Sequence, residues 1–129
     1  MIVGFIRNFV SGLFGLKPSN EWLKDATKHK KAGNWEKAID SLKRGYKKAK
    51  AERVTYSSSY YLRLPKYLYE AGRSDEAWAE YNKMLTNGFD DGELYPKSVY
   101  MAQSQIYGSM SGQLKKENKL FESAIYSAV

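Results

Sequence analysis

The chain contains no cysteine and only one histidine, His29. The missing cysteines exclude disulfides and thiolate chemistry, and a single histidine excludes a histidine-rich metal site. The sequence also lacks a glycine-rich phosphate loop, an H-E-x-x-H motif and a nucleophile elbow. The acidic loop at 90–93 lacks the spacing of a calcium-binding loop, so it is expected to be a solvated turn. We therefore expect no enzyme, no cofactor and no metal site.

No apolar run is long enough to cross a bilayer, which takes about 20 residues. Residues 1–18 form a separate apolar segment ahead of a domain at 19–129. Its apolar residues share one helical stripe: Ile2, Phe5, Ile6, Phe9, Val10, Leu13 and Phe14. Three interpretations stay open: a first helix that covers the neighbouring hairpin, an interfacial membrane anchor, and a docking or targeting segment. The anchor would contact the membrane through Phe5, Ile6, Phe9, Leu13 and Phe14.

Positive charge is concentrated in the first half of the chain. The 129 residues carry a net charge of +7, but residues 1–57 hold 13 Lys/Arg against 5 Asp/Glu, and residues 58–129 hold 8 against 9. An acidic partner or an anionic membrane surface would be attracted to the first half. The basic run at 43–50 is expected to be a solvated helix face, with contact to an acidic protein or to lipid as the alternative.

The chain contains an internal repeat. Residues 32–42 read AGNWEKAIDSL and residues 71–81 read AGRSDEAWAEY, which places Gly33 and Gly72 39 residues apart. Each copy ends one helical pattern at a glycine and opens another with an acidic first turn. A repeat of this period predicts stacked helical hairpins.

The helix signals predict three hairpins. The first pairs residues 21–32, capped by Ser19 or Asn20, with a helix that Asn34 caps and that ends near 53. The second pairs a helix within 56–71 with one from Ser74, its N-cap, to about 85. A third would start at Pro96, break at 111–112 and end in a helix from about 113.

Pro65 falls inside the first helix of the second hairpin. Proline removes a backbone hydrogen bond there and costs about 3 kcal/mol in a helix interior. The helix is therefore expected either to kink, or to start late with Pro65 near its first turn.

These positions resemble the tetratricopeptide repeat (TPR) family, whose unit is a helix pair with bulky and small residues at fixed places. The first unit would be Trp22, Ala26, Gly33, Ala38 and Leu42; the second Tyr61, Pro65, Gly72, Ala77 and Tyr81; a degenerate third Tyr100, Ser104 and Tyr107. The period of 39 departs from the usual 34 of the family. The resemblance implies an all-α protein of about three stacked antiparallel hairpins, a TPR-like α-solenoid, with an N-terminal amphipathic helix.

The same resemblance implies a concave binding face formed by the first helix of each unit. Its positions here are Asn20, Leu23, Thr27, Lys30, Lys31, Ser59, Leu62, Lys66, Tyr69, Glu70, Ser98, Met101, Gln105 and Ser109. The carboxylate clamp of the chaperone-binding branch is missing, because Leu23, Thr27, Leu62, Ser98 and Ala102 occupy its places. Among the tyrosines of this region, Tyr61 is expected in the core, and Tyr69 is the best candidate for a contact with a partner.

The sequence thus predicts a small non-enzymatic adaptor that binds a protein or peptide, with acidic partners favoured. The alternative is an inhibitor- or immunity-type protein that covers the active site of a toxin or enzyme. Nucleic acid is disfavoured because no stacked aromatic set or binding motif accompanies the lysines. The expected location is the cytoplasm, at a membrane surface if residues 1–16 are an anchor.

Overall fold

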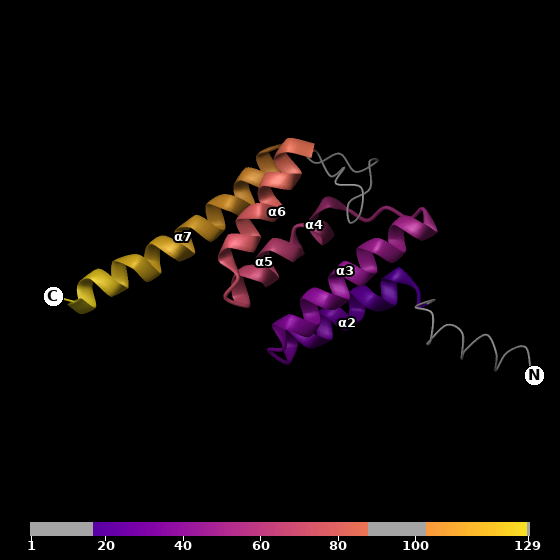
Figure 1. Cartoon of the computed structure of the whole chain (residues 1–129), viewed down its shortest axis with the longest axis horizontal. Helices are drawn as coiled ribbons and strands as arrows, with labels where there is room; N and C mark the ends of the chain where they lie inside the picture. Colours follow the sequence, from indigo (N-terminus) through magenta and orange to yellow (C-terminus); the bar gives the residue numbers. More distant parts are fainter. Residues whose placement is uncertain (1–16, 88–102, 129) are drawn as a thin grey trace, which may run out of the picture. The chain divides into compact units, whose positions relative to one another are not determined.

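In the computed structural model, which describes residues 17–87 and 103–128, every described element is a helix (Figure 1). The expected all-α class is confirmed for these residues. The chain divides after Val54 into two compact units, which we describe separately. The apolar segment 1–16, with its proposed membrane contacts, and Pro96, Ser98, Tyr100, Met101 and Ala102 lie outside the described residues.

The first unit is a hairpin of α2 (Ser19–Lys31) and α3 (Trp35–Glu52). Its core contains Leu23 and Ala26 from α2, and Ala38, Ile39, Leu42, Tyr46 and Ala49 from α3. The two helices approach closely at Gly45, where an added Cβ would lie 2.9 Å from Leu23 Cδ2 and 3.2 Å from Trp22 Cβ. Glycine is therefore required at this position for close contact rather than for backbone freedom.

The start of α2 differs from the prediction. Neither Ser19 nor Asn20 is the N-cap, which is Pro18 in an extended conformation. Ser19 is the buried first residue of α2, and its backbone N–H donates to Glu52 Oε2 of α3 at 3.2 Å. Because Glu52 satisfies one of the orphan N–H groups of the first turn, a capping side chain is not needed there. At α3 the prediction is confirmed: the Asn34 side chain accepts from Lys37 N, and the helix ends at Glu52.

The second unit contains α4 (Ser58–Tyr61), α5 (Arg63–Glu70), α6 (Ser74–Asn87) and α7 (Gln103–Ala128). Pro65 is the third residue of α5 and cannot donate to the Tyr61 carbonyl four residues earlier. The helical path is interrupted only at Leu62, between α4 and α5, so Pro65 lies in the first turn of α5 and the segment as a whole is a broken helix that begins at Ser58. Ser74 was predicted as the N-cap of α6, but it is the first helical residue, because the position matching Asn34 in the repeat is Arg73.

The two hairpin turns have the same hydrogen bonds. In the first, Gly33 N donates to Lys30 O and Asn34 N to His29 O; in the second, Gly72 N donates to Tyr69 O and Arg73 N to Leu68 O. All four distances lie between 2.8 and 3.0 Å. Gly33 and Gly72 have φ of 74° and 80°, the left-handed conformation of a Schellman turn. The repeat of 39 residues is therefore present in the backbone of the described hairpins.

The predicted third hairpin is absent from the described residues. The predicted break at Ser111-Gly112 lies inside α7, which runs without interruption over 26 residues (Figure 1). Glycine in a helix interior costs only about 1 kcal/mol, and neither Gly108 nor Gly112 has a positive φ. No proline follows them, so two glycines alone do not end the helix.

Candidate functional site

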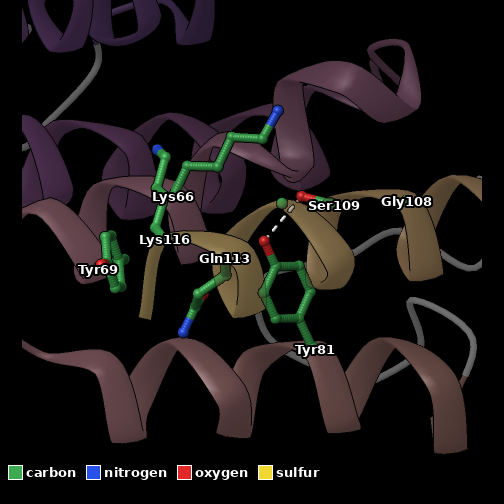
Figure 2. Close-up of a pocket in the computed structure, with 8 residues that line it drawn as sticks. Lys66, Tyr69, Tyr81, Gly108, Ser109, Gln113 and Lys116 are labelled. Atoms are coloured by element: carbon green, nitrogen blue, oxygen red, sulfur yellow. Dashed lines mark hydrogen bonds between the residues drawn. The ribbon is translucent and has the colours of Figure 1, made fainter. Parts of the chain in front are cut away.

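The second unit contains a pocket of about 200 Å³ between α5, α6 and α7, which we call the α7 pocket. Its lining residues are Lys66, Tyr69, Tyr81, Gly108, Ser109, Gly112, Gln113 and Lys116. Figure 2 shows side chains from α7 opposite Lys66 and Tyr69 of α5, with Tyr81 reaching in from α6. None of the lining residues is acidic.

Five lining residues come from one face of α7. They are Gly108, Ser109, Gly112, Gln113 and Lys116, at i, i+1, i+4, i+5 and i+8, which is the spacing of a single helical stripe. A Cβ added at Gly108 or Gly112 would meet no atom within 4 Å. The two glycines therefore leave open space beside the helix, and this space is part of the pocket.

Tyr81 anchors α7 to α6 at the inner side of the pocket. Its hydroxyl lies 2.7 Å from Ser109 Oγ, and either group can donate (Figure 2). The tyrosine is fully buried. Burial raises the pKa of Tyr81, and the hydrogen bond with Ser109 offsets part of that rise. The phenol is therefore neutral at physiological pH and acts as a hydrogen-bonding group.

Gln113 has an unpartnered acceptor. Its side chain is buried, with 5% of the residue exposed, and its Nε2 donates to Glu117 Oε1 at 3.3 Å. Trp78 Nε1 donates to the same carboxylate oxygen at 3.2 Å. Because Glu117 accepts, the amide nitrogen must face it, and Gln113 Oε1 is left buried with no hydrogen-bond partner among the described residues. An unsatisfied buried acceptor costs about 1–3 kcal/mol.

Two lysines make the pocket positive. Lys116 Nζ lies 3.4 Å from Glu70 Oε1 and 5.6 Å from the centre of the Tyr69 ring. Both partners of the Lys116–Glu70 pair are well exposed, so the pair is weak and easily exchanged. Lys66 is exposed and forms no ion pair with the residues that the structure describes. An anion entering the pocket would therefore meet two available ammonium groups.

A second feature of α7 is a line of exposed apolar side chains, which we call the apolar stripe: Tyr107, Leu114 and Phe121. They are 52%, 50% and 66% exposed, and the neighbouring Leu120 is 67% exposed. Residues seven apart lie on nearly the same line along a helix. The stripe therefore spans four turns on the side of α7 that lies away from Gly108, Gly112 and Lys116, because each residue advances the helix by about 100°.

The structure corrects part of the predicted binding face. Leu23 and Leu62 are 4% and 8% exposed, so their side chains belong to the cores and are not available to a partner. Leu23 is turned inward because it fills the space beside Gly45. The resemblance to the TPR family implied that both leucines lie on the concave face, and this part of the expectation is wrong.

The other predicted residues remain accessible to different degrees. Asn20, Lys30, Lys31, Ser59, Lys66, Glu70 and Gln105 are exposed, and Thr27, Tyr69 and Ser109 are partly exposed. Lys66, Tyr69 and Ser109 line the α7 pocket, and Glu70 pairs with Lys116 at its edge. Gln105 instead accepts from Ser58 Oγ at 3.1 Å. Tyr61 is fully buried, as expected.

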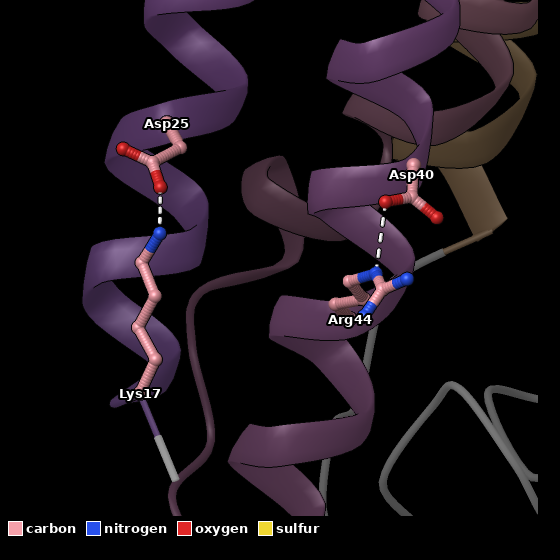
Figure 3. A network of polar contacts seen from close by, with 4 residues as sticks. All are labelled: Lys17, Asp25, Asp40 and Arg44. Atoms are coloured by element: carbon pink, nitrogen blue, oxygen red, sulfur yellow. Dashed lines mark hydrogen bonds and ion pairs between the residues drawn. The ribbon is translucent and has the colours of Figure 1, made fainter. Parts of the chain in front are cut away.

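Two basic residues of the first unit, Lys17 and Arg44, pair with acidic residues of the same hairpin (Figure 3). Lys17 pairs with Asp25, and Arg44 Nε donates to Asp40 Oδ2 at 2.8 Å. Two cationic side chains lie near the Trp22 ring: Lys17 Nζ is 4.3 Å and Arg44 Cζ is 5.4 Å from the ring centre. Arg44 and Lys47 are exposed, in agreement with a solvated helix face over 43–50.

Sequence reasoning missed the α7 pocket because Ser111-Gly112 was interpreted as a break. The usable signal was the small-residue spacing of Gly108 and Gly112, followed one residue later each time by a polar side chain, Ser109 and Gln113. If the segment is treated as one helix, the two glycines and the two polar residues that follow them fall on one face.

Within the described residues there is no group of three or more His, Asp or Glu side chains that could hold a metal ion. Among the same residues, no helix combines the length and apolar character needed to cross a membrane. Comparison of the chain with protein-family models, curated proteins and solved structures finds no match.

Proposed function

We propose that this chain is a non-enzymatic protein-binding module, a small TPR-like adaptor whose main contact surface is α7. The observation that carries the proposal is the apolar stripe of Tyr107, Leu114 and Phe121. Single exposed apolar residues are ordinary on protein surfaces, but several large ones aligned along one helix favour an interaction site.

The surroundings of the stripe fit this role. Ser111 and Asn118 are exposed between the residues of the stripe and give it a polar rim, and Lys115, Lys116 and Lys119 are exposed elsewhere on the same helix. An apolar centre with a polar rim is the usual anatomy of a protein interface. The positive charge of this helix segment favours an acidic partner and opposes pairing of α7 with a second copy of itself.

The TPR-like part of the proposal is supported by the two hairpins. Their turns repeat at 39 residues, and the small residues expected at the helix contacts, Ala26, Ala38 and Ala77, are all fully buried. Solenoid repeats of this kind present extended surfaces without reactive groups. A location in the cytoplasm, or at a membrane surface through residues 1–16, belongs to the same proposal.

The test is quantitative affinity capture from the native cell with the full chain and two variants. Leu114→Ser combined with Phe121→Ser removes two of the three side chains of the stripe, and Leu120→Ser changes an exposed leucine of the same helix outside the stripe as the matched control. We expect a partner that the wild type and the control capture and that the double variant loses at least about tenfold, equivalent to about 1.4 kcal/mol. Equal capture by all three would overturn the proposal.

The same material separates an adaptor from an inhibitor. If the captured partner is an enzyme or toxin, its activity is measured with and without an excess of this protein. Unchanged activity supports the adaptor, and loss of activity that depends on the stripe supports the inhibitor.

A further inference from the structure

We infer that the α7 pocket binds a carboxylate with an adjacent N–H donor, as an acidic residue within a peptide segment of the partner provides. The inference rests on the proposed protein-binding function and names the chemistry that this partner would present. It follows from three properties of the pocket: an unsatisfied acceptor, two ammonium groups and open space of limited size.

The unsatisfied acceptor indicates that the ligand carries a hydrogen-bond donor. Gln113 Oε1 is buried and unpartnered, and its orientation is fixed because Nε2 is held by Glu117. Only a group with an N–H or O–H can satisfy this oxygen. A backbone amide of a bound peptide meets the requirement, whereas a phosphate or a nucleic-acid backbone presents oxygen acceptors that this carbonyl would repel.

The two lysines indicate that the ligand also carries a negative charge. Lys66 and Lys116 are the charged lining residues, and both are cationic. Glu70 already shows that Lys116 accepts a carboxylate as a partner, at 3.4 Å in an exposed pair. A carboxylate that enters the pocket can replace Glu70 in a less exposed place, where a charge-assisted hydrogen bond is stronger.

The size selects one residue rather than a larger ligand. The pocket holds about 200 Å³, less than the roughly 300–1,000 Å³ of sites for drug-sized molecules. Its width beside α7 comes from Gly108 and Gly112, where side chains would project into open space. One acidic side chain with its own peptide N–H therefore fits the arrangement of donors and acceptors.

The experiment is an NMR titration of the full ¹⁵N-labelled chain with a blocked tripeptide, acetyl-Ala-Glu-Ala-amide. The backbone amides of Gly108 and Gly112 and the side-chain amide of Gln113 are the reporters. We expect these three signals to shift together, and the same peptide with Gln at its centre to bind at least about tenfold more weakly. Acetate, a carboxylate without an N–H, is expected to move the lysine signals and not the Gln113 amide.

Variants locate the site. Lys66→Gln and Lys116→Gln should each weaken binding of the Glu peptide several-fold, whereas Lys119→Gln, an exposed lysine of α7 outside the pocket, should not. Gly112→Met should abolish the shifts by filling the open space. This change also replaces glycine by a better helix former, so loss of binding would not be due to loss of the helix.

Three outcomes overturn the inference. They are no shift with any probe, which makes the pocket a water site; equal effects of acetate and the Glu peptide, which makes it a simple anion site; and equal binding of the Glu and Gln peptides. These results are independent of the stripe variants. Capture that needs Leu114 and Phe121 without a pocket titration leaves the protein-binding function standing and removes only this inference.

Discussion

The two hairpins of this chain share their turns and differ in their interiors. The α2–α3 and α5–α6 turns have the same hydrogen bonds 39 residues apart, with glycine at the same left-handed position. Where the first hairpin has Ala26 and Gly45, the second has Pro65 and Met84, and all four residues are buried. The two hairpins thus share the hydrogen bonds and the glycine of the turn, but different residues fill the space between their helices.

The difference shows how a repeat tolerates change. Gly45 lets α3 approach Trp22 and Leu23 closely, and α2 stays continuous past Ala26. In the second hairpin Met84 supplies the volume that Gly45 lacks, and Pro65 divides the first helix into α4 and α5. The packing of each hairpin therefore depends on the residues found at these two positions. Exchanging them between the hairpins should lower the free energy of unfolding.

The largest effect is expected for Met84→Gly, which gives the second hairpin the residue of the first. Removal of a buried methionine side chain, together with glycine in a helix, should lower the free energy of unfolding by about 4 kcal/mol. Urea unfolding combined with hydrogen exchange of residues 55–87 measures it. Lys83→Gly, next to it on the surface, isolates the helix-propensity part; equal losses for the two variants would contradict the explanation.

The next effect is that of Ala26→Pro, which gives the first hairpin the proline of the second. Proline in the middle of α2 should cost about 3 kcal/mol or more and divide the helix. Hydrogen exchange should show loss of protection in the turn before residue 26. Ala26→Gly is the control for propensity, at about 1 kcal/mol. A tolerated proline would mean that Pro65 is not what separates α4 from α5.

A smaller loss is expected for Gly45→Met, the reverse exchange. The added side chain meets Leu23 and Trp22 at once, and overpacking of this kind costs about 2 kcal/mol even after the gain in helix propensity. Thermal melting of this variant is compared with Lys47→Met, the same residue at an exposed position of α3. A melting temperature equal to that of the control would show that the close approach at Gly45 is not required.

A small gain is expected for Arg53→Gly. Arg53 follows α3 with φ of 59°, the left-handed conformation that the other two turns give to glycine. Relief of this conformation should stabilise the first hairpin by about 1 kcal/mol, and Gly72→Ala should destabilise the second by a similar amount. The denaturant midpoint should rise for Arg53→Gly and fall for Gly72→Ala. A lower midpoint for Arg53→Gly would show that the arginine side chain stabilises the turn.

The smallest effect is a pH dependence of the second unit. Burial raises the pKa of Tyr61, Tyr67 and Tyr81 above the ordinary 10.0, offset in part by the Tyr56 amide, the Arg63 charge and Ser109 respectively. Stability from the neutral phenols is fully present below pH 10 and lost as the pH rises through the folded pKa values. Urea unfolding at rising alkaline pH, with tyrosinate absorbance as the probe, should show unfolding and ionisation together. Ionisation in the intact fold would contradict it.

The sequence predicted the features that depend on a few local residues. Gly33, Gly72 and Asn34 determine turns and a cap through their own backbone or side chain, and Pro65 acts on the helix that contains it. The predictions that failed depend on distant residues: Glu52 replaces the cap expected from Ser19, and Gly45 turns Leu23 inward. The α7 pocket needs three helices together, so no local pattern contains it.

The contacts that close the α7 pocket have a kinetic consequence. Each hairpin turn joins neighbours in the chain, but Tyr81–Ser109 and Trp78–Glu117 join residues 28 and 39 apart. Distant contacts are slower to form because a longer loop must close first. Docking of α7 should therefore be the last event in the folding of the second unit, and its release should be the first event in unfolding. A ligand bound in the pocket would stabilise the docked helix and slow this first step of unfolding.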